Sequence, residues 1–485
     1  MKRTILIFLM ILVSYSVLAQ SKAKTEYENF KEYAISSYSD FRDRVNKEYA
    51  KLVEQAWKWY VVKPVITKPK EKLLPPVVIQ DNDQIEVVDN PIIIQKIINT
   101  PEIVPQPIPI APIKEDLKSL DNTITINLYG TNFSVRVPND VEFRMDDISN
   151  VEVAKVWKKL STEKYNNLIR DCLEHRISKQ LNDWAYLRLI DSVCYKIFDS
   201  RSDEAEIMKA YIYSQSGYQM RIANFNGHLK MLFGTKHKIY GMPYWEVDGI
   251  FYYGGNDVQQ RIQICDVSYP GERPMSLYIC QLPKLTLNPA NLRMIQSNDV
   301  DWMQASVRED INLMKYLGDY PTSQIGDDPL TRWMMYAQTP ISDNARTELY
   351  PSIRKWIKDK SSVESVDCIC HWIQTGFTYE FDDKIWGQDR AFFADETLFY
   401  PYCDCEDRSI LLTRIVRDLL GLKCALVYYP GHLATAISLG EDVEGDYIRI
   451  DGEKFIICDP TYINAPIGLT MPGMDNNSAK VILLR

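Results

Sequence analysis

The sequence is organised around one octapeptide near its C-terminal end, Tyr402-Cys403-Asp404-Cys405-Glu406-Asp407-Arg408-Ser409. Apolar residues follow this stretch at helical spacing, and Gly421 stands where such a helix would end. The spacing therefore predicts that Cys405 lies at the N-terminus of a helix. Unpaired backbone N–H groups and the positive end of the helix dipole stabilise a thiolate at such a position.

Two residues further along the chain stand in contexts that suit catalysis. His432 follows a Pro-Gly turn and opens an apolar run, and Asp459 closes the next apolar run. A cysteine at a helix start, followed by a histidine and an aspartate on successive strands, is the order of a thiol acyl-transfer triad. Cys405 would be the nucleophile, His432 the base and Asp459 the residue that orients the imidazole.

The triad sets a condition on the sheet. His432 begins its predicted strand, whereas Asp459 ends its own. The two side chains can meet only if strands 432–439 and 454–459 pair antiparallel. The excursion from 440 to 452 is therefore expected to lie outside that pair or at an edge of the sheet.

These motifs resemble those of a known superfamily. Cys405-x-Asp407-x-Ser409 before a helix, then Gly431-His432 and Asp459-Pro460-Thr461, are similar to the transglutaminase-like superfamily. The closer resemblance is to its secreted bacterial branch with a C-terminal transglutaminase-like domain, over about residues 340 to 485. The resemblance implies a papain-like core with Cys405 as nucleophile, His432 as base and Asp459 as orienter. Cys403 departs from the family pattern and leaves the redox state of the nucleophile open.

A metal site at the cysteines is not expected. Cys368, Cys370 and His371 could bind zinc together with Cys403 and Cys405. However, a single residue between two cysteines suits tetrahedral zinc poorly, and Cys370 lies on an apolar helical stripe. We therefore expect no metal and no cofactor. The chain has ten cysteines, so disulfide bonds are possible in an oxidising compartment, and the sequence does not determine their pairing.

Candidate donors to an oxyanion are also suggested by the sequence. The backbone N–H of Cys405 is one, and an upstream side chain, Gln374 or Tyr402, is another. Asp407 is expected to cap the first helical turn.

The first residues have the pattern of a secretory signal. Residues 1–19 carry a basic start, an apolar run from Ile5 to Val13 and small residues before Gln20. We expect a periplasmic or secreted protein with no membrane span after signal removal. The net charge of −9 argues against a nucleic-acid partner.

Two segments precede the predicted domains. Residues 20–62 are expected to form a long amphipathic helix, because apolar residues recur from Tyr27 to Tyr60 at steps of three and four. This helix would dock on the body of the protein or on a partner. Residues 63–113 are rich in proline and are expected to form an extended, semi-rigid linker that is partly packed on the surface.

Residues 114–290 are predicted to form a mixed helix and strand domain. Alternation around Gly130 indicates a hairpin, helical patterns cover about 147 to 215, and short strands follow, at 220–223, 229–233, 250–253 and 277–282. The segment from Asp203 to Phe233 aligns without gaps on Asp407 to Ile437, at a shift of 204 positions (432 − 228). His228 then matches His432, whereas Arg201 replaces Cys405. This domain is therefore a candidate degenerate copy of the catalytic one, or a chance likeness.

The predicted fold class is α+β, with a transglutaminase-like catalytic domain at 291–485. The expected function is cysteine-dependent acyl transfer on amide bonds of a protein or peptide substrate, through an acyl-enzyme. Hydrolysis is favoured over cross-linking to an amine. The alternative is a non-catalytic periplasmic or extracellular scaffold or binding protein that uses the same fold.

Overall fold

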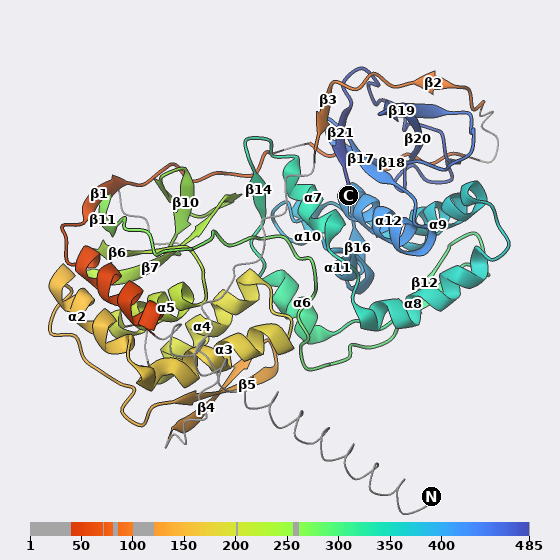
Figure 1. Cartoon of the computed structure of the whole chain (residues 1–485). Coiled ribbons are helices and arrows are strands. Elements are labelled where there is room, and N and C mark those ends of the chain that lie inside the picture. The colour runs from red at the N-terminus through yellow and green to blue at the C-terminus, as the bar shows by residue number, and fades with distance from the viewer. Residues whose placement is uncertain are drawn as a thin grey trace, which may run out of the picture.

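The protein consists of two lobes that lie side by side (Figure 1). The computed structural model describes residues 40–70, 72–80, 86–99, 121–199, 202–255 and 261–484. Both lobes combine helices with one larger sheet, so the fold is mixed α+β, as predicted. The predicted signal segment, the start of the predicted N-terminal helix and the end of the predicted linker lie outside the described residues.

The N-terminal lobe contains a six-stranded sheet in the order β1-β11-β6-β7-β10-β9. Its strands are β1 (Lys58–Val61), β6 (Met220–Phe225), β7 (His228–Thr235), β9 (Trp245–Val247), β10 (Ile250–Tyr253) and β11 (Arg261–Cys265). Its helices are α2 (Asn150–Leu160), the short 3-10 helix η1 (Glu163–Tyr165), α3 (Asn166–Ser178), α4 (Asp183–Ile197) and α5 (Asp203–Gln215). The predicted helical region is thus confirmed.

The predicted hairpin is also confirmed, as β4 (Asn122–Leu128) and β5 (Thr131–Val137). Tyr129 and Gly130 both have positive φ angles, of 47° and 71°, which is the backbone of a tight two-residue hairpin turn.

The C-terminal lobe contains a seven-stranded sheet in the order β2-β19-β20-β18-β17-β21-β3. Its strands are β2 (Asn90–Pro91), β3 (Lys96–Ile98), β17 (Cys424–Tyr429), β18 (His432–Ile437), β19 (Asp446–Ile450), β20 (Glu453–Cys458) and β21 (Lys480–Leu483). Its helices are α8 (Asp343–Trp356), α9 (Ser362–Gly376), α10 (Asp382–Ile385), α11 (Ala394–Phe399) and α12 (Cys405–Leu420). A short parallel pair, β15 (Thr378–Tyr379) and β16 (Tyr402–Cys403), lies before α12.

Residues 291–340 connect the two lobes. They form β12 (Arg293–Gln296), β13 (Gln304–Val307), α6 (Ile311–Gly318), β14 (Ser323–Ile325) and α7 (Thr331–Gln338). β14 pairs with β8 (His237–Ile239) of the N-terminal lobe, whereas α7 packs on α12 of the C-terminal lobe. One hydrophobic core runs through both lobes, from Trp157 to Leu433, so the lobes share a buried interior.

The helix that follows the octapeptide forms where the sequence places it. Asp404 is the residue before the first turn, and Gly421 ends α12 with a φ of 67°, in the left-handed region that favours glycine. The Asp407 carboxylate accepts the N–H of Asp404 at 3.2 Å and that of Phe392 at 2.7 Å, which confirms its predicted role in the first turn.

The sheet of the C-terminal lobe satisfies the condition set by the triad. β18 pairs antiparallel with β20, with Thr435 opposite Cys458, and β19 lies on the far side of β20. The start of β18 and the end of β20 therefore meet at one end of the sheet, as the sequence predicted.

The two lobes share a topology. In both, a helix is followed by an antiparallel strand pair, then a second hairpin, then a strand that returns beside the first. The strand order is β11-β6-β7-β10-β9 in one lobe and β21-β17-β18-β20-β19 in the other. β6 and β17 coincide in both bounds at the predicted shift of 204, and His228 and His432 each begin the next strand. The two segments thus correspond in order and pairing.

Two predictions of secondary structure are wrong. Residues 40–53 are helical, but the helix does not continue to Tyr60, because Lys58–Val61 pairs with β11 as strand β1. Its aromatic and β-branched residues suit an edge strand as well as a helical stripe. Residues 277–282 are not a strand: the N–H of Leu277 donates to His237 and that of Tyr278 to Ser276, in place of a strand partner.

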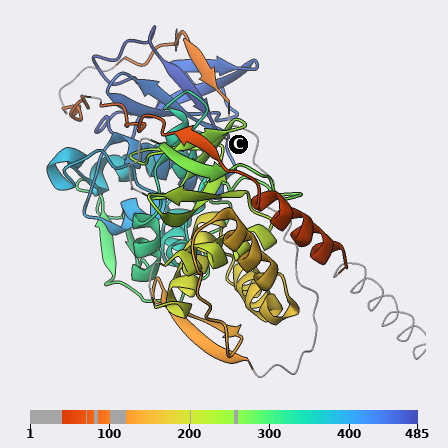
Figure 2. The same ribbon diagram turned by 90° about the vertical axis from the view of Figure 1, so that its left-hand side faces the viewer.

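The helical segment 40–53 docks on the body of the protein. Asn46 accepts hydrogen bonds through one oxygen from Trp157 and Tyr269, and the Tyr49 ring lies 4.9 Å from that of Trp157. The following chain runs across the molecule from β1 to the C-terminal lobe (Figures 1 and 2). There β2 and β3 add to opposite edges of the seven-stranded sheet. The first residues of the predicted linker, Lys63 and Ile66, bond instead to the N-terminal lobe, so its described part is packed on both lobes.

Ser409 fastens α12 to the sheet, and this contact is testable. Its hydroxyl donates to the Leu433 carbonyl at 2.8 Å, and both groups are buried. Ser409→Ala would leave that carbonyl without this partner, so we expect the free energy of unfolding in urea to fall by about 1–3 kcal/mol. Ser352→Ala, on α8 with a half-buried side chain, is the control. Equal stability of the two variants would contradict the role given to Ser409.

Candidate active site at the first turn of helix α12

The structure joins two of the three predicted catalytic residues. Nε2 of His432 lies 2.7 Å from Oδ2 of Asp459, and both side chains are buried. The other Asp459 oxygen accepts the N–H of Thr461 at 2.8 Å, which fixes the carboxylate. This carboxylate holds the imidazole so that Nδ1 is free, and Nδ1 is buried with no hydrogen-bond partner among the described residues. A buried nitrogen without a hydrogen-bond partner lowers the stability of the folded state unless a partner reaches it.

Cys405 lies beside this pair but is not hydrogen-bonded to it. The backbone N–H of Leu433, the residue after His432, is close enough to the Cys405 sulfur to lower its pKa. The thiol itself donates to Oε2 of Glu406 at 3.3 Å. Within the described part of the chain no hydrogen bond joins the sulfur to the His432 ring. The expected contact between nucleophile and base is therefore absent from this conformation.

The surroundings of Cys405 disfavour a thiolate. The thiol is completely buried, and its pKa is raised first by this burial and then by the Glu406 and Asp404 carboxylates. The helix N-terminus therefore does not prevail over these opposing effects here. In this state the cysteine is a protonated thiol.

Arg408 fixes the helix relative to the other parts of the site. Its buried guanidinium donates to the carbonyls of Gln374, Phe377 and Pro460. These residues end α9 and follow β20, so one side chain ties α12 to the loop that carries Asp459. This role could not be predicted from the sequence, because it depends on three carbonyls that are distant along the chain.

Of the two suggested side-chain donors to an oxyanion, Gln374 is already hydrogen-bonded elsewhere. The Gln374 amide donates both hydrogens to backbone carbonyls, those of Asp459 at 3.0 Å and Ala465 at 3.1 Å. Tyr402 is 40% exposed on β16. Gln374 therefore supports the loop that holds Asp459, and the backbone N–H of Cys405 remains the donor predicted by the sequence.

All cysteines outside the site except Cys280 are core residues. All ten are free thiols, nine of them buried and Cys280 exposed. Cys368 and Cys370 are buried on α9, whereas His371 points away to Asp299 at 3.0 Å. Cys403 is buried on β16 as a free thiol.

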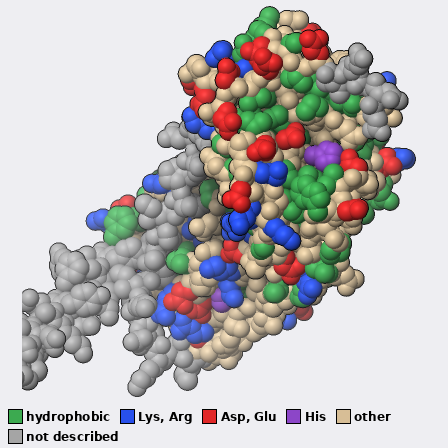
Figure 3. Space-filling model, turned by 90° about the vertical axis from the view of Figure 1, so that its right-hand side faces the viewer, with side chains coloured by type: hydrophobic (Ala, Val, Ile, Leu, Met, Phe, Trp, Pro, Cys, Tyr) green, Lys and Arg blue, Asp and Glu red, His purple; other side chains and the backbone are tan. Residues whose placement is uncertain are grey.

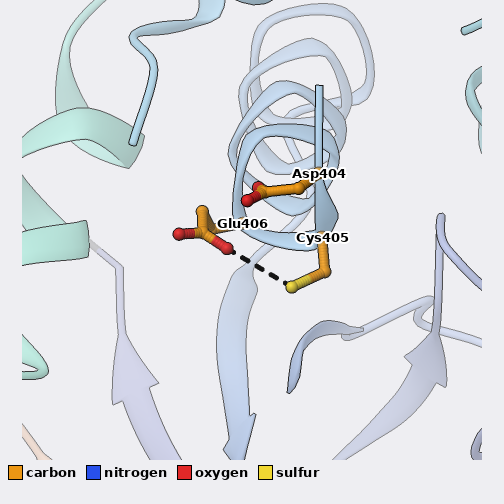
Figure 4. A group of neighbouring side chains, drawn as sticks. All are labelled: Asp404, Cys405 and Glu406. Carbon is orange, nitrogen blue, oxygen red and sulfur yellow. Dashed lines mark hydrogen bonds between the residues drawn. The ribbon is translucent and has the colours of Figure 1, made fainter. Parts of the chain in front are cut away.

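An acidic cluster that was not predicted from the sequence surrounds the first turn of α12. It consists of the buried residues Asp382, Asp404 and Glu406 and the half-buried Asp389. Oxygens of Asp382, Asp389 and Glu406 lie within 4.8 Å of one another, and so do the ligand atoms of Asp404, Cys405 and Glu406. Figure 4 shows the Asp404 carboxylate pointing toward Glu406. Its sequence signal is the repetition of acidic residues at 380–389 and 404–407.

The cluster is electrostatically frustrated. Burial and the nearby Glu406 raise the pKa of Asp382 to about 8, and burial also raises the pKa values of Asp404 and Glu406. Both Asp404 oxygens are buried without a hydrogen-bond partner among the described residues. Carboxylates in this state either bind protons or are neutralised by a cation.

The cluster could hold a hard divalent cation. Ca²⁺ binds carboxylate oxygens at about 2.3–2.6 Å, so two oxygens on one ion are at most about 5 Å apart. The spacing of the Asp382, Asp389 and Glu406 oxygens falls within this limit. Acidic side chains are also scattered over the surface of this lobe (Figure 3).

Comparison with known proteins does not identify a family. No family model, no curated protein and no solved structure matches this chain. No helix among the described residues is both long and apolar enough to cross a bilayer.

Cation binding would be visible in thermal unfolding. We expect Ca²⁺ to raise the midpoint of wild-type unfolding by several degrees, because a ligand at 100 times its Kd adds about 2.7 kcal/mol to stability. Glu406→Gln should lose most of this shift, since Glu406 belongs to both groups of ligand atoms. Its midpoint without the cation should not fall, because one buried charge is removed.

The exposed Glu441→Gln variant is the matched control and should keep the shift. An unchanged shift in Glu406→Gln would exclude this site, and so would a wild-type midpoint that responds to none of Ca²⁺, Mg²⁺ and Mn²⁺.

Proposed function

We propose that this chain is a thiol acyl-transfer enzyme that cleaves amide bonds, held here in a resting conformation. The observation that carries the proposal is the buried His432–Asp459 pair, 2.7 Å apart, with Nδ1 of the ring unpartnered beside the start of the helix that carries Cys405. An oriented imidazole with one free nitrogen is what a thiol needs for deprotonation.

In the proposed reaction, the Cys405 side chain first rotates from Glu406 toward His432. Nδ1 then takes the thiol proton, and the sulfur attacks the carbonyl carbon of an amide. The tetrahedral intermediate collapses when the imidazolium gives its proton to the leaving amine. Water, activated by the same imidazole, then hydrolyses the thioester and restores the thiol.

The proposed fold of the C-terminal lobe is papain-like. A helix with the nucleophile at its N-terminus packs on an antiparallel sheet that supplies the histidine and the aspartate from adjacent strands. Together with the motif resemblance, this arrangement supports a member of the transglutaminase-like superfamily. Hydrolysis is favoured over transfer to an amine, and a periplasmic or secreted location is proposed from residues 1–19 alone.

The resting position of the thiol favours a second candidate. Cys405 is protonated, buried and hydrogen-bonded to Glu406, as in a protein that keeps the fold but not the chemistry. The chain would then be a non-catalytic secreted scaffold or binding protein.

An electrophilic peptide probe separates the two candidates. We expect an epoxide probe to label Cys405, to lose at least about 100-fold in rate in His432→Ala, and about tenfold in Asp459→Asn, because general-base assistance contributes 10²–10⁴. Cys405→Ala should abolish labelling, whereas Cys403→Ala should keep it. Labelling that is insensitive to His432→Ala would leave only the scaffold.

A further inference from the structure

Residues 72–79, here called the strap, cross the loops that carry the predicted catalytic residues. The Leu74 N–H donates to the carbonyl of Gly431, which directly precedes His432, at 3.0 Å. Further along, the Ile463 N–H donates to the Val77 carbonyl at 2.8 Å, and the Ile79 N–H donates to the Ile463 carbonyl at 3.0 Å. Ile463 follows Asp459 by four residues. The strap thus forms a backbone ladder beside both His432 and Asp459.

The strap also closes the site on the side of the nucleophile. The Tyr379 hydroxyl donates to the Leu74 carbonyl at 3.3 Å, and the Cys405 thiol is among the groups that raise the pKa of Tyr379. Tyr379 is therefore hydrogen-bonded to the strap and close enough to the sulfur to interact with it electrostatically.

The approach of the two chain segments is unusually close at Gly431. Its φ is +81°, and a Cβ at this position would lie 2.4 Å from the Lys72 carbonyl oxygen. Glycine here allows a second, extended chain to lie directly against the start of β18. Backbone pairing of this kind is the way in which extended peptides are recognised by the edge of a sheet.

The strap binds through alternate side chains, as an extended peptide does. Ile79 is buried with Tyr462 and Met471, and Leu74 and Val77 pack on the same cluster. Val78, between them, is 47% exposed. The contacts therefore require aliphatic residues at some positions and tolerate proline, since Pro75 and Pro76 lie within the strap.

The site must open before it can act. Cys405 is 0%, His432 2% and Asp459 4% exposed, whereas a reacting carbonyl has to come within about 3–3.5 Å of the sulfur. The strap has no regular secondary structure beyond a single bridge from Val78 to Ile463. The strap is held by fewer main-chain hydrogen bonds than the strands beneath it. Its detachment from the lobe therefore requires less free energy than the opening of those strands.

We propose that the strap occupies the peptide-binding site of this enzyme, so that the resting chain is blocked by its own segment and the substrate is an extended peptide of aliphatic and proline residues that replaces it. The proposal rests on the function proposed above, because it gives that site its substrate class. The strap is then a competitor of the substrate, and its release exposes Cys405.

The test is the rate at which iodoacetamide alkylates Cys405 in the full-length chain, read by mass spectrometry of the Cys405 peptide. Ile79→Asp places a charge among the apolar residues that Ile79 packs against, which destabilises the bound strap. A larger fraction of the molecules is then open, so the alkylation rate should rise about tenfold or more. Val78→Asp changes the exposed neighbour in the same way and should leave the rate unchanged. Ile79→Ala is the milder variant and should raise the rate if Ile79→Asp does not fold.

A peptide with the sequence of residues 72–80 supplies the second arm. Added in excess to an Ile79 variant, it should return the alkylation rate toward that of the wild type, whereas a scrambled peptide should not. A folded Ile79 variant with wild-type alkylation, or a peptide without effect on the faster variant, would overturn the proposal.

Alkylation requires access to the sulfur but no catalysis, so this test is separate from that of the proposed function. If the strap variants open the site while the epoxide probe remains insensitive to His432→Ala, the catalytic function fails and the blocked binding site stands. If the probe depends on His432 but the strap variants change nothing, the function stands and the substrate class falls.

Discussion

The burial of the first turn of α12 is the constraint on which the rest of the C-terminal lobe depends. Every residue from Asp404 to Ser409 is inside the protein, and most of them are polar or ionisable. Buried polar groups must be paired, so the surrounding segments are arranged to meet them. Asp407 accepts two backbone N–H groups, Arg408 gathers three carbonyls, and Ser409 donates to β18. Glu406 accepts the Cys405 thiol, and the Asp404 oxygens have no hydrogen-bond partner among the described residues, so burial raises the pKa of Asp404 well above its usual range.

This constraint links stability to chemistry. The same turn that fixes the sheet against the helix also surrounds the thiol with carboxyl groups that oppose its ionisation. A cation bound by Asp382, Asp389 and Glu406 would neutralise the Glu406 carboxylate and so weaken its part in that opposition. The resting state of Cys405 and the state of the cluster are therefore coupled through Glu406, which bonds the thiol and belongs to both groups of ligand atoms.

The two lobes share one topology but differ in the side chains around the corresponding histidines, His228 and His432. In the N-terminal lobe the backbone N–H of Leu229, the residue after His228, donates to Asp203 at 2.6 Å. The equivalent N–H of Leu433 faces the Cys405 sulfur. The His228 side chain is 80% exposed, and its Nδ1 lies 3.6 Å from Asp203 at the start of α5, whereas His432 is buried against Asp459, which follows β20. The helix and strand framework is thus repeated in a lobe that lacks the cysteine and the buried histidine–aspartate pair of the proposed site. This is expected when the framework is stabilised by its core and the site by a few side chains added to it.

The sequence by itself determined the local features. It specified helix α12 and its end at Gly421, and the strand that begins at His432, because spacing and turn residues act over short distances. It also specified the strand that ends directly before Asp459, at Cys458, and its antiparallel pairing with the first, because the histidine and the aspartate had to meet. Even the internal correspondence of the lobes was visible as a gapless shift. Tertiary structure alone decided the rest. The arrangement of Asp382 and Asp389 around Glu406, the three carbonyls around Arg408, and the placement of residues 72–79 over the site are contacts between distant segments. The end of the first helix was decided in the same way, since residues 58–61 fit a helical stripe but gain more by pairing with β11. Local patterns encode which surface each segment buries, whereas the identity of the partner depends on the packing of the whole chain.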